Sequence, residues 1–583
     1  MNRITRSIAA VLAIGLLASQ PAFAAPWSFD SSTARNGKSY VHIQESYDVG
    51  QPSRVKLGTR SADGSSSSAT CLVFPSEVCP ESLLGNTYGD PETGASYPYQ
   101  NLYFELVMPA CEVAPSKDWC IDDLRIYAIG ETPASAEFIG SVGPETTPAV
   151  PSRGIPSGGH ISLWQGGTGS GFESLRVAAI AQVNLVYYPF SGSNYVAQDF
   201  NLQIIPYEER RGSNYYSIEP TQLPGAQEGL GGTFDLVSGC IWQREGSCGE
   251  RVDSPEGVTY GVTLRSDIPI GEFFNGRLQD PNLSVDDSNG VSILSLDAAP
   301  VRVGEFGIVY DKTAQLESEM PFLTGAQITK PYFDDAMQMI DGFRELAGDK
   351  ASGENTSWRL STTNVSGLNS CYSNYGVAGL VTTNATTYEG DPPTYDSGYL
   401  NYKVAGMHFM ANGQDLYLGT YDLVIKSEVA RCLYGFRNAP ISATVAVVGE
   451  QGEENIATTI VSEKDGWLKL AAYGFTFSEK EIQVQLRQSQ IKTLSNFTSS
   501  SLSAKQKAEI RAVLAKSDGN TKFICTGIRY YQQPMRENIK VRARAKAACE
   551  YAKSINPNFS YWYQTKTTQA RSYNGKVMVV SKG

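Results

Sequence analysis

The chain of 583 residues contains only three histidines, His42, His160 and His408. Because histidine is the commonest general base and a frequent zinc ligand, this scarcity argues against a Ser–His–Asp site and against a zinc centre. The chain also lacks the G-x-S-x-G, H-E-x-x-H, G-x-x-x-x-G-K-[ST] and G-x-G-x-x-G motifs. These absences favour a protein that is not an enzyme, and we predict no cofactor and no metal. Glycosidases with paired carboxylates leave no such local signature, so that enzyme class remains an alternative.

Charged residues are few, at 19% of the chain, and only one long apolar run is present, at the N-terminus. The first residues read MNRITR, then SIAAVLAIGLLAS, then PAFAA, which is the pattern of a secretory signal peptide over 1–24 with cleavage after Ala24. The apolar run is too short for a transmembrane helix. We therefore expect an exported protein, secreted, extracellular or cell-wall associated, without a transmembrane segment.

Cysteine, in contrast, is well represented, because ten residues form five sequence-local groups. The groups are Cys71 with Cys79, Cys111 with Cys120, Cys240 with Cys248, Cys371 with Cys432, and Cys525 with Cys549. In an exported chain, an even number of cysteines with such spacings predicts five disulfides that close successive loops. Partial pairing with some free thiols is the alternative.

Most of the chain has the pattern of antiparallel β-sheet. Short alternating runs such as NLYFELVMPA and LRVAAIAQVNLVYYPF lie between turns rich in Gly, Pro and Ser. A Pro- and Gly-rich stretch at 143–159 indicates a boundary, so we expect β-rich, sandwich-like domains over 25–150 and 151–320. The fold class is therefore mostly β and multidomain.

A connector over 321–354 and a further β-domain follow. The connector contains one amphipathic helix, whose apolar face we expect to pack on a sheet. That face comprises Tyr332, Phe333, Met337, Ile340, Phe343 and Leu346. Strands resume over 355–495, in a size and pattern typical of an immunoglobulin-like domain with Cys371–Cys432 as its disulfide.

The last part of the chain, 496–583, is strongly basic. Residues 501–583 contain 16 Lys and Arg against 4 Asp and Glu, whereas the preceding 500 residues contain 32 and 56. Such an asymmetry indicates an interaction surface for anionic partners. Ser503 and Gln506 have capping-box spacing, and the pattern predicts helix, strand, helix, strand, an Asn574–Gly575 turn and a final strand.

The second helix of this region, within 540–557, has a narrow apolar stripe formed by Val541, Ala545, Ala548, Ala552 and Ile555. Cys549 lies beside this stripe and therefore faces inward. We expect it to form a disulfide with Cys525 in the preceding strand, FICTG, which would stabilise the fold by roughly 3 kcal/mol.

These residues resemble the OmpA-like C-terminal domain, a small α/β module of bacterial envelope proteins. The matching stretches are NFTSSSLSAKQKAEIRAVLAK at 496–516, FICTGI as the central strand, and RAKAACEYA at 544–552. The resemblance implies a site for the diaminopimelate group of peptidoglycan, formed by an Asp after the central strand and an Arg on this helix. The Arg corresponds to Arg544, but Arg529 occupies the place of the Asp.

A basic residue there suits phosphates or carboxylates, which arginine binds through bidentate contacts. The candidate anion-binding or wall-binding residues are Arg529, Asn538, Arg542, Arg544 and Lys546. An ordinary solvated helix face is the alternative. The stretches GTYDLVIKSEVARCLYGF and DGWLKLAAYGFTFSEKEI, in the middle of the chain, resemble modules of secreted actinobacterial surface proteins.

Together these features predict a non-catalytic exported protein of the cell envelope or cell surface. Its partner is expected to be a cell-wall polymer or another surface protein, bound through the basic C-terminal module, and not nucleic acid. The alternative is a secreted polysaccharide hydrolase with its site in the β-rich region. The pattern makes no prediction of the oligomeric state.

Overall fold

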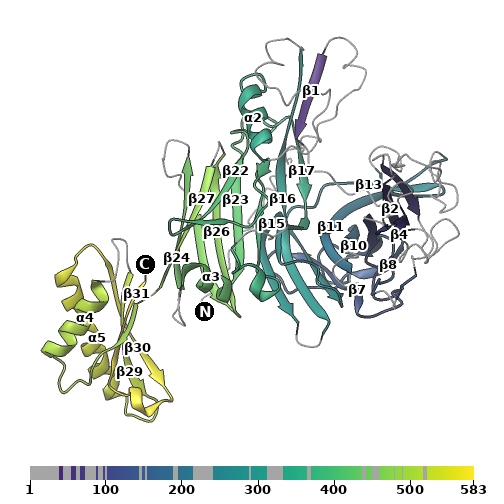
Figure 1. Cartoon of the computed structure of the whole chain (residues 1–583). Coiled ribbons are helices and arrows are strands. Elements are labelled where there is room, and N and C mark those ends of the chain that lie inside the picture. The colour runs from purple at the N-terminus through teal and green to yellow at the C-terminus, as the bar shows by residue number, and fades with distance from the viewer. Residues whose placement is uncertain are drawn as a thin grey trace, which may run out of the picture.

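The protein consists mostly of β-strands, with a few helices (Figure 1). The structure, a computed structural model, describes residues 38–582 except for these stretches: 44–53, 61–65, 72–86, 90–95, 99–100, 143–147, 151–153, 188–194, 214–239, 288–289, 312–332, 364–368, 436–440, 450–457, 478–479, 489 and 516–521. The predicted signal peptide lies outside the described residues. The predicted fold class, mostly β followed by a small α/β module, is confirmed.

One long sheet runs through the β-rich part of the molecule. Its strands are hydrogen-bonded in the order β3–β2–β6–β10–β11–β18–β15–β19–β23–β26–β25, and only the β15–β19 pair is parallel. The bounds are β2 Arg54–Arg60, β3 Ser66–Cys71, β6 Asn101–Val107, β10 Arg176–Tyr187, β11 Tyr195–Arg211, β15 Phe273–Asp286, β18 Arg359–Thr363, β19 Gly379–Thr383, β23 Leu418–Lys426, β25 Thr458–Lys464 and β26 Trp467–Thr476.

A second sheet packs against the first and forms a sandwich with it. It contains β7 (Trp119–Ala128), β14 (Val258–Ser266), β16 (Ser292–Asp311) and the second half of β15. The alternating residues Val258, Tyr260, Val262 and Leu264 of β14 lie in the shared core, as the alternation in the sequence predicts. Strand β15 leaves the long sheet at a bulge around Asp280 and so belongs to both layers.

Six shorter strands extend these sheets, and two more pair only with each other. Strands β1 (Lys38–Ile43) and β17 (Gly353–Ser357) pair with β16, β9 (Ser162–Gln165) pairs with β10, and β8 (Glu137–Ser141) pairs with β9. Strand β13 (Ser247–Arg251) pairs with β11, and β12 (Cys240–Arg244) pairs with β13. The separate pair is β4 (Thr87–Gly89) with β5 (Ser96–Pro98).

The other end of the long sheet takes part in a second sandwich. The facing sheet runs β20–β22–β27–β24, with β21 also paired to β22. Its strands are β20 Thr387–Tyr388, β21 Thr394–Asp396, β22 Tyr399–Ala405, β24 Ile441–Gly449 and β27 Lys480–Gln488. Buried aromatic residues, among them Tyr402, Tyr421 and Phe475, fill the space between the two layers.

The predicted connector helix is present as α2 (Phe333–Phe343). Its residues Met339, Ile340 and Phe343 pack on the pair of strands β1 and β16, and the rings of Phe343 and Tyr310 are 4.9 Å apart. Leu346 was expected on the same buried face but is 65% exposed, because the helix ends at Phe343. Of the predicted apolar face, Tyr332 lies outside the described residues.

The C-terminal module has its own sheet and its own core. Strand β28 (Gln490–Thr493) precedes α4 (Ala504–Leu514), β29 (Lys522–Tyr530), α5 (Arg536–Ile555), β30 (Ser560–Thr568) and β31 (Val577–Lys582). The sheet order is β28–β31–β29–β30, and both helices lie on one side of it (Figure 1). Ser503 and Gln506 form the predicted capping box of α4. Gly527 lets α5 approach closely, because a Cβ there would lie 2.2 Å from the Val541 carbonyl oxygen.

Four of the five predicted disulfides are confirmed: Cys111–Cys120, Cys240–Cys248, Cys371–Cys432 and Cys525–Cys549. The predicted Cys71–Cys79 pair lies outside the described residues, since Cys79 is within 72–86. In α5, Cys549 faces inward with Val541, Ala545, Ala548 and Ala552, as predicted. Ile555 was expected in the same stripe but is 42% exposed at the end of the helix.

Strand pairing crosses several of the predicted domain boundaries. Strand β6 lies before 150 and pairs with β10, and β15 lies before 320 and pairs with β18 and β19. The regions 25–150, 151–320 and 355–495 therefore share one sheet.

The 355–495 region does contain a sandwich, but Cys371–Cys432 joins a loop to the helix α3 (Ser427–Tyr434) instead of joining two facing strands. Strand β28 also places the start of the C-terminal sheet before residue 496. A Pro- and Gly-rich stretch forms a surface loop as readily as a linker, so it does not by itself mark a boundary between domains.

Candidate functional site

The five predicted binding residues all lie in the C-terminal module, one on β29 and four on α5. Arg529 is near the end of β29, on the face of the sheet that the helices cover, and its guanidinium donates to the backbone carbonyl of Gln533. This contact ties the end of the strand to the loop before α5. Arg529 is therefore half-buried and engaged in holding that loop.

Arg544 is also engaged in packing. Its Nη1 donates to the carbonyl oxygen of Gly575 at 2.8 Å, and its Nε donates to that of Ser499 at 3.3 Å. Its guanidinium carbon lies 5.4 Å from the centre of the Phe497 ring. Arg544 thus joins three segments that are distant in the sequence, and backbone carbonyls accept from two of its nitrogens.

The other three residues form a stripe on α5, in which Arg542 and Lys546 are exposed and Asn538 is half-buried. Asn538, Arg542 and Lys546 follow one another at intervals of four, which places them on one helix face. Arg542 lies 5.9 Å from the centre of the Tyr563 ring, and Lys546 is 3.6 Å from Glu550. Contacts of this kind at a protein surface are weak, so both cations can turn toward a ligand. The structure therefore separates the five residues into this stripe and two packed arginines, and does not bring them into one pocket.

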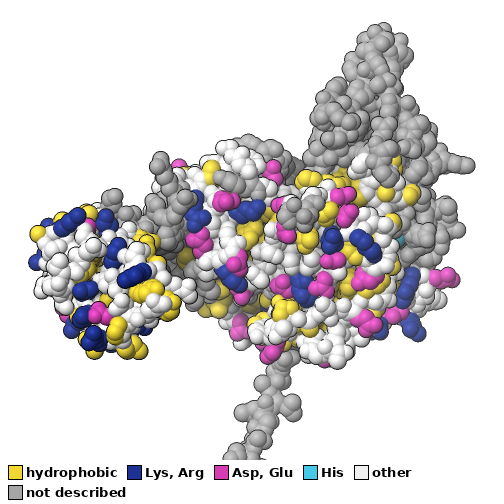
Figure 2. All heavy atoms as spheres, turned by 90° about the horizontal axis from the view of Figure 1, so that it is seen from below, with side chains coloured by type: hydrophobic (Ala, Val, Ile, Leu, Met, Phe, Trp, Pro, Cys, Tyr) yellow, Lys and Arg dark blue, Asp and Glu magenta, His cyan; other side chains and the backbone are white. Residues whose placement is uncertain are grey.

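Further cations, exposed or half-buried, extend the basic surface beyond the predicted residues. Lys540 lies on α5 beside Glu537, at 2.7 Å, while Lys507 and Arg511 on α4 both contact the Tyr551 ring or its hydroxyl. Figure 2 shows Lys and Arg side chains spread over the visible face of this module, with few acidic ones between them. The count of charges in the sequence signals this surface, although no motif identifies its members.

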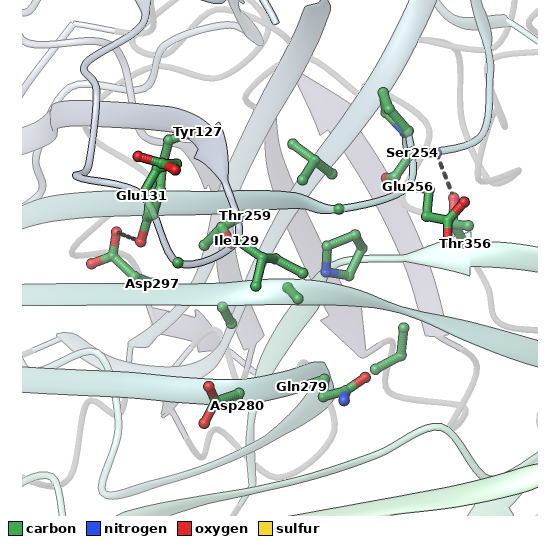
Figure 3. Close-up of a pocket in the computed structure, with 18 of the residues that line it drawn as sticks. Tyr127, Ile129, Glu131, Ser254, Glu256, Thr259, Gln279, Asp280, Asp297 and Thr356 are labelled. Atoms are coloured by element: carbon green, nitrogen blue, oxygen red, sulfur yellow. Dashed lines mark hydrogen bonds between the residues drawn. The ribbon is translucent and has the colours of Figure 1, made fainter. Parts of the chain in front are cut away.

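A cavity of about 730 Å³ lies in the β-rich part, a site that the sequence does not reveal (Figure 3). It opens between the end of β7, the start of β14, the bulge of β15 and the middle of β16. Polar residues line it together with apolar ones that include Ile129 and Pro300. The carboxylates in its lining are Glu131, Glu256, Asp280 and Asp297.

Two of these carboxylates are engaged in ion pairs. Asp280 binds the ammonium group of Lys469, and Asp297 accepts from Arg125 at 2.9 Å. Within the described residues, Glu131 and Glu256 have no ion pair, and they stand on opposite sides of the cavity in Figure 3. A ligand in this cavity would meet two available acidic groups.

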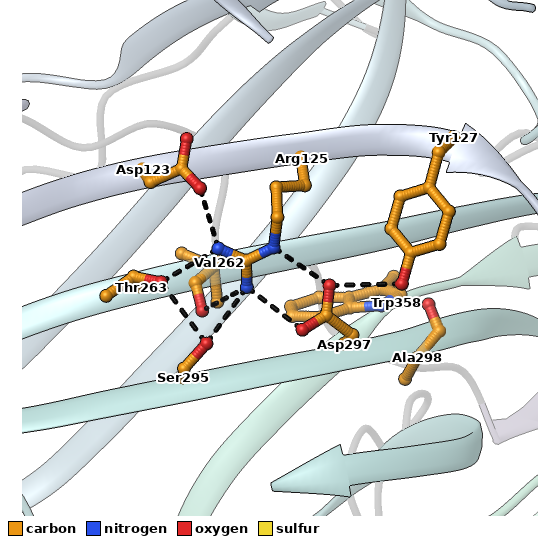
Figure 4. Close-up of polar contacts among 9 residues, drawn as sticks. All are labelled: Asp123, Arg125, Tyr127, Val262, Thr263, Ser295, Asp297, Ala298 and Trp358. Atoms are coloured by element: carbon orange, nitrogen blue, oxygen red, sulfur yellow. Dashed lines mark hydrogen bonds and ion pairs between the residues drawn. The ribbon is translucent and has the colours of Figure 1, made fainter. Parts of the chain in front are cut away.

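Asp297 belongs to a network that spans three strands (Figure 4). The Arg125 guanidinium also donates to Asp123 at 2.7 Å, Thr263 at 2.8 Å and Ser295 at 3.0 Å. Burial alone would lower the pKa of Arg125, but its pairs with Asp297 and Asp123 raise it above the usual value. This network fixes β7, β14 and β16 to one another, so Asp297 has a structural role at the wall of the cavity.

Tyr127 completes the network on the cavity side. Its hydroxyl donates to Asp297 at 3.1 Å. Burial, together with the negative charge of Asp297, raises the pKa of Tyr127 to about 12. Tyr127 is therefore a neutral hydrogen-bonding group at ordinary pH.

His408 forms no catalytic triad in the described part of the chain. His408 lies in the loop between β22 and β23, and its Nδ1 is 2.5 Å from the Asp349 carboxylate. No hydroxyl or thiol side chain bonds to His408 among the described residues. Burial alone would raise the pKa of Asp349, but hydrogen bonds from Arg344 and His408 hold it below its usual value. The pair links two loops.

The described residues also contain no group of three His, Cys, Asp or Glu side chains suited to a metal ion. None of the helices described is both long and apolar enough to cross a bilayer. No protein-family model matches this chain, and no curated protein matches it significantly. Its function must therefore be argued from its own residues.

Proposed function

We propose that this protein is a non-catalytic exported protein of the cell envelope or cell surface. Its C-terminal module attaches it to an anionic wall polymer or to an acidic surface partner, while the β-rich part forms the bulk of the exposed molecule. The predicted signal peptide and the four disulfides support export, since disulfides persist in oxidising compartments.

The exposed basic stripe of α5 is the observation that carries the proposal. Arg542 and Lys546 lie at the surface on one face of α5 and Lys540 is exposed on another, in a module with 16 cations and 4 anions over 501–583. A surface of this kind binds polyanions through many weak contacts and releases counterions, so its affinity falls steeply with salt. On the matching stretches, we propose that this module is related to the OmpA-like domain. It would then keep the fold of that domain but not its usual ligand. Arg544 donates to two backbone carbonyls. Binding of an anionic polymer over the exposed surface is therefore favoured over binding of one ligand group in a pocket.

A binding assay with purified cell walls tests this attachment. The mature chain is expected to co-sediment with the walls at low salt and to lose binding as salt rises. The triple variant Lys540→Ala, Arg542→Ala, Lys546→Ala is expected to bind at least tenfold more weakly. The matched control removes three exposed cations from the β-rich part, with Arg210→Ala, Arg211→Ala and Lys464→Ala. Equal weakening by both triple variants, or no binding at low salt, would refute attachment through α5.

A second candidate is a secreted polysaccharide hydrolase. The cavity of Figure 3 favours it, because Glu131 and Glu256 are acidic groups without an ion pair among the described residues. Glycosidases use two carboxylates, one as general acid and one as base or nucleophile. Release of reducing sugars from wall or matrix polysaccharides, abolished in both Glu131→Gln and Glu256→Gln but not in Asp280→Asn, would support the hydrolase. Turnover that neither glutamine variant changes would exclude this cavity as its site.

A further inference from the structure

The C-terminal sheet ends in an unprotected edge strand. Strand β30, of nine residues, pairs only with β29, and all but two of its residues are exposed at the surface. Trp562, near its start, is 60% exposed. Among the strands described, none pairs along the outer edge of β30.

The outward backbone groups of this edge can be assigned from one hydrogen bond. The Tyr531 amide donates to the Thr568 carbonyl at 3.0 Å, so the backbone groups of Thr568 point toward β29. Because the direction alternates along a strand, the N–H and C=O groups of Tyr561, Tyr563, Thr565 and Thr567 point outward. The register with β29 is continuous from Ser560 to Thr568, and no shift interrupts this alternation.

Exposed edges of this kind are usually blocked by proline, by a bulge or by several charges, since they otherwise add strands from other chains. Strand β30 has no proline and no bulge, and Lys566 is its only charged residue. The uncovered face of the sheet adds an apolar row, because the strand registers align Trp562 with Ile524, Val580 and Ile491. Both features favour a partner strand beside β30.

We propose that β30 pairs in antiparallel fashion with β30 of a second copy of this chain, about a two-fold axis at Gln564. This register pairs Tyr561 with Thr567 of the second copy, and Tyr563 with Thr565, so that every outward N–H and C=O of the edge gains a partner. On the uncovered face, Trp562 lies opposite Lys566 of the second copy. The two four-stranded sheets become one continuous sheet.

The side chains of β30 are self-complementary in this register. Trp562 and Lys566 occupy a non-hydrogen-bonded pair, where opposing side chains are closest, and an ammonium group is attracted to the face of an indole ring. Aromatic residues opposite threonines, as in the Tyr–Thr pairs, are also favourable across strands. A register centred one residue away leaves part of the edge unpaired, and one centred on Lys566 would oppose two lysines. The strand therefore suits its own copy better than an unrelated peptide.

A register-specific crosslink tests the proposal in the mature full-length chain. In a Gln564→Cys variant the two new thiols meet at the axis, where non-hydrogen-bonded Cα atoms are about 4.5 Å apart, so a disulfide-linked dimer is expected. In the matched Lys566→Cys variant the two thiols lie more than about 7 Å apart, and no linked dimer is expected. Linked dimers in both variants, or in neither, would overturn this register.

Light scattering over a range of concentrations tests the interface itself. Thr565→Pro removes an outward N–H without touching the β29 pairing, and it is expected to give a monomer, whereas Thr565→Val keeps the N–H and the dimer. Trp562→Lys is expected to give a monomer by opposing two lysines, and the double variant Trp562→Lys, Lys566→Trp to restore the dimer. A wild-type chain that stays monomeric, or a dimer that survives Thr565→Pro, would refute pairing through β30.

The dimer does not depend on the polymer-binding role, and scattering in the absence of any polymer separates the two. If both hold, the two basic modules of a dimer are joined, and attachment to a polymer gains from bivalence.

Discussion

Arg544 of α5 donates from Nη1 to the carbonyl oxygen of Gly575, at 2.8 Å, in the turn before β31. Gly575 has a φ of +75°, and a Cβ at this position would lie 3.0 Å from the same Nη1. The turn therefore needs glycine both for its backbone conformation and for the approach of the arginine. Arg544, which the OmpA-like resemblance matches to a ligand-binding arginine, therefore has a structural role in this chain.

Arg544→Ala is expected to destabilise the C-terminal module by about 2 kcal/mol. The substitution leaves the carbonyls of Ser499 and Gly575 without their charged donor. A hydrogen bond to a charged group contributes about 1.5–3 kcal/mol, and the part-buried bond to Gly575 supplies most of the loss because the bond to Ser499 is exposed. Arg542→Ala, on the exposed face of the same helix, is expected to change stability by less than about 0.5 kcal/mol. Hydrogen exchange of the α5 and β31 amides in the mature chain measures both effects. Equal protection in the two variants would contradict the structural role of Arg544.

The buried carboxyl of Asp422 predicts a pH dependence of stability. Asp422 is fully buried in β23, accepts from the Tyr473 hydroxyl at 2.5 Å and lies 3.7 Å from Lys469. Burial raises the pKa of Asp422 to about 6, although Lys469 and Tyr473 favour its charged form. In the unfolded chain the pKa of an aspartate is about 3.9.

Between about pH 4 and pH 6 the folded protein therefore retains a proton at Asp422 that the unfolded chain has released. Stability from this group is fully present below about pH 4 and is lost as the pH rises through 6, by roughly 3 kcal/mol in total. Asp422→Asn is expected to remove this slope, so the variant gains stability relative to wild type as the pH rises. Urea denaturation at pH 4, 5, 6 and 7 measures it, with the exposed Asp465→Asn as control. A constant difference between Asp422→Asn and wild type over this range would contradict the prediction.

Arg277 is expected to be essential for the junction of the two sandwiches. Its side chain is 1% exposed, donates to the carbonyls of Thr383, Ala385 and Thr386, and stacks on the Tyr388 ring at 4.4 Å. Arg277→Leu leaves these carbonyls buried without their donor and is expected to cost about 3–5 kcal/mol. Arg277→Lys should not rescue it, because an ammonium group cannot reproduce the planar fork of donors.

The urea midpoint of the mature chain measures this loss, and Arg211→Ala at an exposed position is the matched control. A midpoint for Arg277→Leu close to that of the control would show that the contacts of Arg277 contribute little.

The Cys525–Cys549 disulfide is expected to stabilise the C-terminal module by roughly 3 kcal/mol, since it closes a loop between residues 24 positions apart. The double variant Cys525→Ser, Cys549→Ser is expected to lower the unfolding temperature of this module and leave that of the β-rich part unchanged. Scanning calorimetry measures both transitions. The Cys111→Ser, Cys120→Ser variant, which affects the β-rich part, provides the opposite control, and a shift in the same transition for both would contradict the assignment.

Local features of this protein follow from the sequence alone. The alternation of Val258, Tyr260, Val262 and Leu264 identifies a half-buried strand because side chains alternate between faces. The Ser503–Gln506 capping box and the inward position of Cys549 follow from helical spacing. In each of the four disulfides described, a cysteine pairs with the next cysteine along the chain, so the pairing follows the order of the cysteines in the sequence.

Only the tertiary structure decides the long-range relationships. The pairing of β15 with β19, the structural role of Arg544 and the cavity beside Asp297 each depend on residues far apart in the chain. No local pattern encodes such contacts, because a polar or charged side chain has the same spacing whether it faces solvent or a distant carbonyl. The sequence by itself determined the elements of this protein and the basic character of its last module. The tertiary structure decided which strands share a sheet and which cations remain at the surface, because both depend on how separately formed elements bury one another.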